Sequence, residues 1–337
     1  NAWSKLLAMN LEVDMFLNVL SEMHSPDPIT AITHFGQQDS GVYVAGNICF
    51  KDGVLLSLEE ARVAVINPYF ASKHCQQSMY PLIKIVPYPH VRYTIHISMW
   101  NDIYPSFFGV NEMAAKAVLC MGIMALHADK FWAGQAGLAK FPVGLAISDM
   151  AGTGKTIALS TVQALVGMNR VPLMAGSSTH VAMQTRLGLF RDGMLCVDDY
   201  VPPPGKDKQM AELVRQVFER SSRQIGGDGA CQRNIEMPLM LTSNKSVCAD
   251  DSAVQSRVLQ FHFKEMETSE QWEELQTAQS LYSCCAQDWG AMTLNGKLDK
   301  EVIGDFVNFL YQAVGVTLCR RTALWAWLLY YMCMVSW

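Results

Sequence analysis

The stretch Val143 to Thr156 reads VGLAISDMAGTGKT, and the fold class follows from it. Its first five residues are apolar, as expected of a parallel strand that is buried on both faces. A glycine-rich turn comes next, and Lys155 and Thr156 then lead into a segment with the apolar spacing of a helix. This order of strand, loop and helix predicts an α/β fold with a phosphate-binding loop, and the alternative is an ordinary glycine-rich connection.

The residue types in this loop suit phosphate and metal binding. Glycines let backbone N–H groups approach phosphate oxygens, and the N-terminus of the following helix adds positive potential. Lys155 is expected to reach the β- and γ-phosphates of ATP, and the Thr156 hydroxyl to bind Mg²⁺. Asp149 stands where the usual motif has its first glycine, and a carboxylate there repels phosphate unless it points away. The residues expected to hold the nucleotide are Ala151, Gly152, Thr153, Gly154, Lys155 and Thr156.

A second apolar run, Met194 to Val197, ends in two carboxylates, Asp198 and Asp199. Parallel strands present ligand-binding residues at their carboxyl ends. At such an edge we expect Asp198 to hold Mg²⁺, mostly through water, and Asp199 to polarise the attacking water. Alone, such a run is a common strand end, but downstream of Lys-Thr it indicates the second half of a nucleotide site.

Three further features follow these carboxylates. The apolar run 237–241 leads to Asn244, whose amide can orient a water molecule without adding charge. Arg257 comes directly before a last strand candidate, Val258 to Phe263. The glycine-rich segment from Arg223 to Arg233 favours either a basic hairpin that contacts nucleic acid or a solvated turn with surface arginines.

In order and spacing, five short motifs resemble those of the superfamily 3 helicases and of related phage and plasmid primase-helicase ATPases, which belong to the AAA+ class. The resemblance covers about residues 111–263. It implies a five-stranded parallel sheet, ATP and Mg²⁺ as ligands, a homo-oligomeric ring such as a hexamer, and ATP-driven movement on single-stranded DNA. The motifs are GTGKT (152–156), LCVDD (195–199), the Arg/Gly hairpin (223–233), LTSN (241–244) and SR (256–257).

The resemblance implies a role for each residue of the nucleotide site. Lys155 and Thr156 match the Walker A motif, and Asp198 and Asp199 match the Walker B motif. Asn244 matches the polar sensor of the γ-phosphate. All these residues would take part in binding or hydrolysing Mg-ATP.

The resemblance also implies roles outside that site. Arg257 matches the arginine finger, which acts on the nucleotide of a neighbouring subunit. Arg223 and Arg233 flank the hairpin that would project into the ring channel and contact DNA. The chain departs from the family pattern at Asp149 and in a hairpin that lacks lysines.

Composition narrows the possible partners. The formal net charge of −5 argues against a broadly basic surface, so nucleic acid must be met by a local patch. The ten cysteines form no C-x-x-C pair, which indicates reduced thiols in an intracellular protein of the cytoplasm or nucleus. The eight histidines show no metal-ligand spacing.

At 337 residues the chain is long enough for more than one domain. We expect an α+β accessory domain over 1–110, a P-loop ATPase core over 111–264 and a helical C-terminal lid or bundle over 265–337. The chain starts at Asn1 without methionine and is expected to be a segment of a longer protein. No membrane contact is expected, because the apolar stretch 323–337 is shorter than the ~20 residues that span a bilayer.

Local patterns predict elements before the phosphate loop. Gly41 to Phe50 and Val54 to Ser57 flank a Lys-Asp-Gly turn, which predicts a β-hairpin. The alternation in Tyr93 to Trp100 predicts a strand. Residues 111–132 predict a long apolar helix that Asn111 caps.

Two other functions remain open at this stage. One is an AAA+ or STAND-like ATPase that remodels proteins or acts as a switch, without a role on DNA. The other is an inactive structural P-loop module, in which Asp149 marks the loss of activity.

Overall fold

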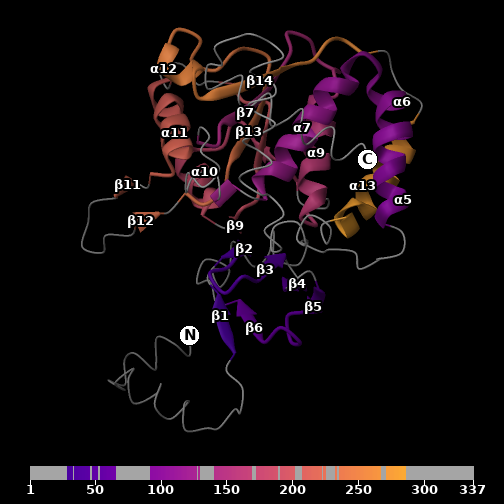
Figure 1. The fold of residues 1–337 in the computed structure, drawn as a ribbon. Coiled ribbons are helices and arrows are strands. Elements are labelled where there is room, and N and C mark those ends of the chain that lie inside the picture. Colours follow the sequence, from indigo (N-terminus) through magenta and orange to yellow (C-terminus); the bar gives the residue numbers. More distant parts are fainter. Residues whose placement is uncertain are drawn as a thin grey trace, which may run out of the picture.

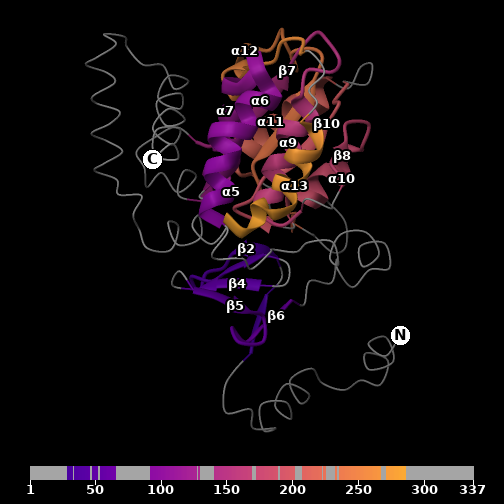
Figure 2. The ribbon, with the colours of Figure 1, turned by 90° about the vertical axis from the view of Figure 1, so that its right-hand side faces the viewer.

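The computed structural model describes residues 29–65, 92–129, 140–168, 172–201, 207–221, 223–224, 232–233, 235–266 and 271–285, apart from 33, 46–47, 52–53, 127 and 189. The apolar stretch 323–337 and most of the predicted C-terminal region lie outside these residues. Figures 1 and 2 show a larger body, in which a sheet lies between helices, and a small sheet at one end of it.

The larger body is built on a five-stranded sheet in which every neighbouring pair of strands is parallel. The central strands are fully buried because their residues are almost all apolar, as the sequence predicts for a sheet covered on both faces. The predicted fold class is therefore confirmed. In spatial order the strands are β14 (Val258–His262), β7 (Val143–Ile147), β13 (Leu239–Ser243), β10 (Leu195–Asp198) and β8 (Met174–Ala175).

Helices cover both faces of this sheet (Figure 1). On one face α7 (Glu112–Ala125) packs against α9 (Lys155–Leu165), which follows the phosphate loop. On the other face lie α10 (His180–Leu187) and α11 (Asp207–Glu219). The N-cap of α10 is Thr179, whose hydroxyl accepts a hydrogen bond from the Ala182 amide at 3.2 Å. A short helix, α12 (Ser252–Gln255), precedes β14.

The predicted strand at Tyr93 to Trp100 is wrong. The chain instead forms α5 (Arg92–Ser98), a π-helical turn η2 (Met99–Ile103), α6 (Tyr104–Phe108) and a 3₁₀ turn η3 (Gly109–Asn111). The alternation of apolar and polar residues over this short stretch fits a strand. Over a longer stretch, however, apolar residues recur every three to four positions, which favours a helix. Its buried residues are Met99, Trp100, Ile103, Tyr104, Phe107 and Phe108.

This helical region packs within the protein. Both α5 and α6 contact α13 (Trp272–Tyr282), which continues into η4 (Ser283–Cys285). Residues 99–125 are long and apolar enough to cross a membrane, but 72% of the most apolar window is buried inside the structure. The chain turns at Gly109, where φ is +48°, and this splits the run between α6 and α7. Burial against the core therefore accounts for its apolar character.

The small sheet contains the predicted hairpin. Strands β4 (Ile48–Lys51) and β5 (Val54–Ser57) pair antiparallel, with Lys51 opposite Val54. The segment Gly41 to Phe50 holds two strands, because β3 (Tyr43–Ala45) pairs back onto β4. The sheet order is β5-β4-β3-β2-β9, with β2 at Phe35–Gln37 and β9 at Phe190–Arg191. Two further strands, β1 (Thr30–Ile32) and β6 (Val63–Val65), form a separate parallel pair.

The small sheet is joined to the larger body through β9. Strand β2 runs parallel to β9, and Gly36 lies opposite Arg191. The Arg191 guanidinium contacts the Asp39 carboxylate at 2.5 Å. The Tyr43 hydroxyl donates to the Asp192 carbonyl at 2.8 Å. These contacts hold the small sheet against β9 and Asp192, which come shortly before β10 in the sequence.

We predict that Gly36→Ala releases this junction. A Cβ at Gly36 would lie 1.6 Å from the Arg191 carbonyl oxygen, and φ is +85° there. The strand pair must therefore separate, and the free energy of unfolding should fall by about 3–5 kcal/mol. Thermal denaturation and limited proteolysis of residues 29–65 measure the effect.

Gly41→Ala is the matched control. Gly41 has a similar φ of +79°, but a Cβ there meets nothing within 4 Å. It should cost only the left-handed backbone penalty of about 1–2 kcal/mol. Equal losses in the two variants would show that the close approach to β9 does not hold the sheet.

Candidate functional site

The phosphate loop follows β7 at the carboxyl edge of the parallel sheet. Gly152 and Gly154 have φ of +69° and +83°, so the loop uses backbone conformations that favour glycine. A Cβ on Gly154 would also lie 3.0 Å from the ring of Phe108 and 3.1 Å from the sulfur of Met266. Helix α9 begins at Lys155, directly after Gly154. Its amino terminus therefore points toward the loop, as anion binding requires.

Lys155 lies at the centre of this loop and is only 8% exposed. Its ammonium donates three hydrogen bonds, which hold it between the loop and the end of β13. The acceptors are Met150 O (3.0 Å), Thr153 Oγ1 (3.2 Å) and Asn244 Oδ1 (3.2 Å). The predicted sensor amide thus lies next to the predicted phosphate-binding lysine.

Carboxylates act on the same ammonium group. Burial lowers the pKa of Lys155, and the charges of Asp199, Asp198 and Asp149 oppose that shift. Asp149 is exposed, but its charge is close enough to stabilise the protonated lysine. The effect of Asp149 on nucleotide affinity stays a prediction.

Thr156 and Asp198 meet across the gap between α9 and β10. The Thr156 hydroxyl donates to Asp198 Oδ1 at 2.9 Å. A hydroxyl and a carboxylate side by side are the oxygen ligands that Mg²⁺ uses when it also binds phosphates. These two residues therefore fit the metal that a P-loop requires.

The backbone after β10 turns sharply at Asp199, where φ is +50°. Its amide donates to the Thr242 hydroxyl at 2.7 Å, and the Asp198 carbonyl accepts from the Gly176 amide at 2.6 Å. A Cβ on Gly176 would lie 2.3 Å from the Asp199 carbonyl oxygen, so this close approach requires glycine. Neighbouring strands thus hold the second carboxylate at the edge that carries Lys155.

Sequence reasoning missed the role of Asn111. The residue occupies the N-cap position of the helical run as predicted, but its side chain makes no capping bond. Instead its amide donates to Thr153 O at 3.1 Å and to Lys264 O at 2.7 Å, and it accepts from Lys264 N at 2.8 Å. Asn111 is 1% exposed and therefore ties the phosphate loop to the segment that leaves β14.

Arg257 lies away from these residues. Its carbonyl accepts a hydrogen bond from the Val143 amide at 3.0 Å, which places it at the amino edge of the sheet. Its guanidinium lies 3.8 Å from the Glu219 carboxylate and 5.3 Å from the centre of the Phe218 ring. The structure therefore does not bring Arg257 to the Lys155 site of the same chain.

The predicted hairpin is present at its base. Strands β11 (Arg223–Gln224) and β12 (Gln232–Arg233) pair antiparallel, with Arg223 directly opposite Arg233. Close to this base, Arg220 forms an ion pair with Glu236. The two strands form the base of a hairpin, while DNA contact by its arginines stays a prediction.

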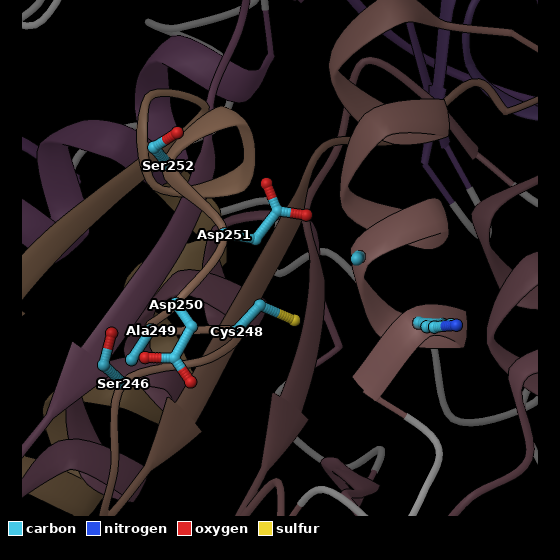
Figure 3. Close-up of a pocket in the computed structure, with 8 residues that line it drawn as sticks. Ser246, Cys248, Ala249, Asp250, Asp251 and Ser252 are labelled. Carbon is cyan, nitrogen blue, oxygen red and sulfur yellow. The ribbon is translucent and has the colours of Figure 1, made fainter.

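A separate pocket of about 550 Å³ lies between α11 and the loop after β13 (Figure 3). Its two carboxylates are Asp250 and Asp251. Asp251 already accepts hydrogen bonds from Arg215 at 2.6 Å and from the Val254 amide at 3.0 Å. The pocket contains none of the predicted site residues, and the described residues include no group of three or more His, Cys, Asp or Glu side chains that could hold a metal ion.

Most of the cysteine side chains that the structure describes are buried. Cys49, Cys120, Cys196, Cys248 and Cys284 are free thiols, and all but Cys248 are buried. Burial raises the pKa of Cys49 to about 11 and shifts the pKa of Cys120 and Cys196 further in the same direction. Raised pKa values keep these thiols protonated and unreactive.

No protein-family model matches the chain, and no curated protein does. Among solved structures, the chain is similar to one described as "SCCmec type IV Cch - active helicase", with a TM-score of 0.63 and 13% identity. The match covers 99% of this chain but 62% of the helicase chain, so the chain spans less than two thirds of that protein.

Two other solved structures match with lower TM-scores. The C-terminal region of NrS-1 matches 89% of this chain and 71% of its own, with a TM-score of 0.38 and 9% identity. JCV helicase matches 66% of this chain and 74% of its own, with a TM-score of 0.30 and 13% identity. These two scores are too low to support an argument. From the parallel sheet and the first likeness, we conclude that the chain has a helicase-like P-loop NTPase fold.

Proposed function

We propose that the chain is an ATP-dependent DNA translocase module that couples hydrolysis of Mg-ATP to movement on single-stranded DNA. The observation that carries this proposal is the convergence of Lys155, Thr156, Asp198 and Asn244 at one edge of the parallel sheet. We further propose that it works inside the cell, in the cytoplasm or nucleus, as a homo-oligomeric ring such as a hexamer. The domain boundaries at 110/111 and 264/265 belong to the same proposal.

Each residue of the site would have a separate task. Lys155 would bind the β- and γ-phosphates. Phosphate oxygens would then replace the three oxygens that now accept hydrogen bonds from its ammonium. Thr156 and Asp198 would hold Mg²⁺, which supplies charge neutralisation at the phosphates when bound. Asp199 would polarise the attacking water, and Asn244 would orient it against the γ-phosphate.

DNA binding would fall to the hairpin. The chain has a formal net charge of −5, so most of its surface does not attract DNA. Arg223 and Arg233 lie opposite each other in the β11–β12 ladder and would contact successive phosphates without reading bases. Such contacts suit a motor that is indifferent to sequence.

The test of this assignment is the salt dependence of single-stranded DNA binding. Arg223→Ala/Arg233→Ala should weaken binding to all sequences alike and lower the salt slope by up to ~1.4, at ~0.7 per lost contact. Basal ATP hydrolysis should stay unchanged, because neither residue is assigned to the nucleotide. Fluorescence anisotropy of labelled oligonucleotides over a salt series measures both quantities.

Lys51→Ala/Arg62→Ala is the charge-matched control, since both residues are exposed and lie away from the hairpin, Lys51 on β4 and Arg62 in the turn before β6. This control should leave the slope at its wild-type value. If the hairpin variant binds DNA with the wild-type affinity and slope, the hairpin is not the DNA contact. An ATPase that acts on proteins would then be the better assignment.

A further inference from the structure

We infer that Thr242 is the positioning residue for Asp198, the carboxylate assigned to Mg²⁺. This inference rests on the proposed function and adds a residue to which no motif assigned a role. Thr242 lies on β13, between β7 and β10, and is 1% exposed.

The Thr242 hydroxyl uses both of its hydrogen-bonding capacities on the Asp198–Asp199 pair. It donates to Asp198 Oδ1 at 2.7 Å and accepts from the Asp199 amide at 2.7 Å. A hydroxyl has one proton to donate, and it is used on the carboxylate. One side chain therefore links the orientation of Asp198 to the turn at Asp199.

The carboxylate needs such a partner because its terminal torsion is poorly restrained. The last torsion of aspartate has a broad distribution, so packing alone does not set the plane of the two oxygens. Asp198 Oδ1 accepts from Thr242 at 2.7 Å and from Thr156 at 2.9 Å. Thr156 is itself a proposed metal ligand, which leaves Thr242 as the partner with no other assigned task. Mg²⁺ demands near-ideal octahedral geometry, so a rotated carboxylate binds it less well.

The local sequence also argues against a purely packing role. Thr242 follows Leu239, Met240 and Leu241 in a fully buried strand. Valine has nearly the same shape and would fill this place without burying a hydroxyl group. The hydroxyl is therefore best explained by its two bonds to the carboxylate pair.

The test compares Thr242→Val with Thr242→Ser by electron paramagnetic resonance of Mn²⁺, which stands in for Mg²⁺, in the presence of a non-hydrolysable ATP analogue. Thr242→Val should weaken Mn²⁺ binding 10- to 100-fold, as expected for loss of a partner that orients a metal ligand. Thr242→Ser keeps the hydroxyl and should restore binding to near the wild-type value. Binding of the analogue without metal should be equal in all three proteins, since the two hydrogen bonds of the Thr242 hydroxyl go to Asp198 and Asp199 and not to the phosphate loop lysine.

Thr161→Val is the matched control. Thr161 is 0% exposed, and its hydroxyl donates to Ile157 O at 3.1 Å and accepts from Gln279 Nε2 at 2.6 Å. It should lower thermal stability as much as Thr242→Val does and leave Mn²⁺ binding unchanged. If Thr242→Val also leaves Mn²⁺ binding unchanged, the inference is overturned while the proposed function stands.

Two further outcomes are distinguishable. A wild-type chain that binds the analogue but no Mn²⁺ overturns the proposed metal site and this inference together. If Thr242→Val does not fold, Thr242→Cys replaces it, because a thiol is a weak donor of similar size. An intermediate loss of Mn²⁺ affinity in that variant supports the inference, and wild-type affinity overturns it.

Discussion

Lys155→Ala should abolish ATP hydrolysis and weaken nucleotide binding. The lysine ammonium is nearly buried and donates to Met150 O, Thr153 Oγ1 and Asn244 Oδ1, so it is the cation placed to meet the phosphates. Nucleotide binding by fluorescence and phosphate release by a coupled assay measure the two effects.

Asp199→Asn separates the two steps of the same site. The variant should preserve nucleotide binding and stop hydrolysis, because a positioned general base contributes ~10²–10⁴-fold to the rate. Lys116→Ala is a control, since Lys116 is equally buried but pairs with Glu112 on α7. A Lys155→Ala protein that hydrolyses ATP at the wild-type rate shows that the site is wrongly assigned.

The second large effect concerns Arg257. Strand β7 separates the amino edge, where Arg257 lies, from the phosphate loop by five residues. At 3.3 Å per residue this is about 16 Å, too far for Arg257 to reach a nucleotide of its own chain. We therefore predict that it acts on a neighbouring subunit, where loss of an arginine finger costs ~10³-fold or more in turnover.

Mixing subunits tests action between chains. Arg257→Ala and Lys155→Ala proteins should each be inactive alone and should recover activity when mixed, because a mixed ring contains some sites with both residues intact. Glu219→Gln is the control, since it removes the ion pair with Arg257 and keeps the arginine. A structural role for that pair predicts equal losses in the Glu219 and Arg257 variants. No recovery in mixtures that still assemble would count against action between subunits.

The parts of the site that were predicted from the sequence are those that local patterns encode. Apolar runs lead to Lys155, Asp198 and Asn244, and parallel pairing brings the carboxyl ends of such runs to one edge of a sheet. In the structure, Lys155 and Asn244 meet at this edge. Local composition is enough to predict these strand ends, because a buried strand and a glycine loop are each encoded by a few consecutive residues.

The parts that were missed depend on partners far along the chain. The sequence predicts that Asn111 caps a helix, but its side-chain amide donates hydrogen bonds to the carbonyl groups of Thr153 and Lys264. From the sequence, Thr242 is an ordinary residue of a core strand, and only the structure shows its hydrogen bond to Asp198. Short windows cannot reveal such pairings, because each requires the tertiary fold to bring two segments together.

The same reason explains the errors in the first third of the chain. Strand β2 pairs with β9, which places Phe35 opposite Phe190 with their ring centres 5.0 Å apart. No local sequence pattern predicts this pairing. The alternation in Tyr93 to Trp100 is a short window that fits a strand, whereas the helical spacing emerges only when the window extends to Phe108. Secondary structure there follows the longer pattern.

The most direct test of the account is one measurement of Mg²⁺-dependent ATP hydrolysis by the wild-type chain, with and without single-stranded DNA. A motor that moves on DNA turns over faster when DNA occupies its channel, so we expect stimulation that is absent in Lys155→Ala and lost in Arg223→Ala/Arg233→Ala. Hydrolysis at the same rate with and without DNA would contradict a DNA translocase. Absence of any Mg²⁺-dependent hydrolysis, under conditions in which the chain is folded and assembled, would contradict the ATPase itself.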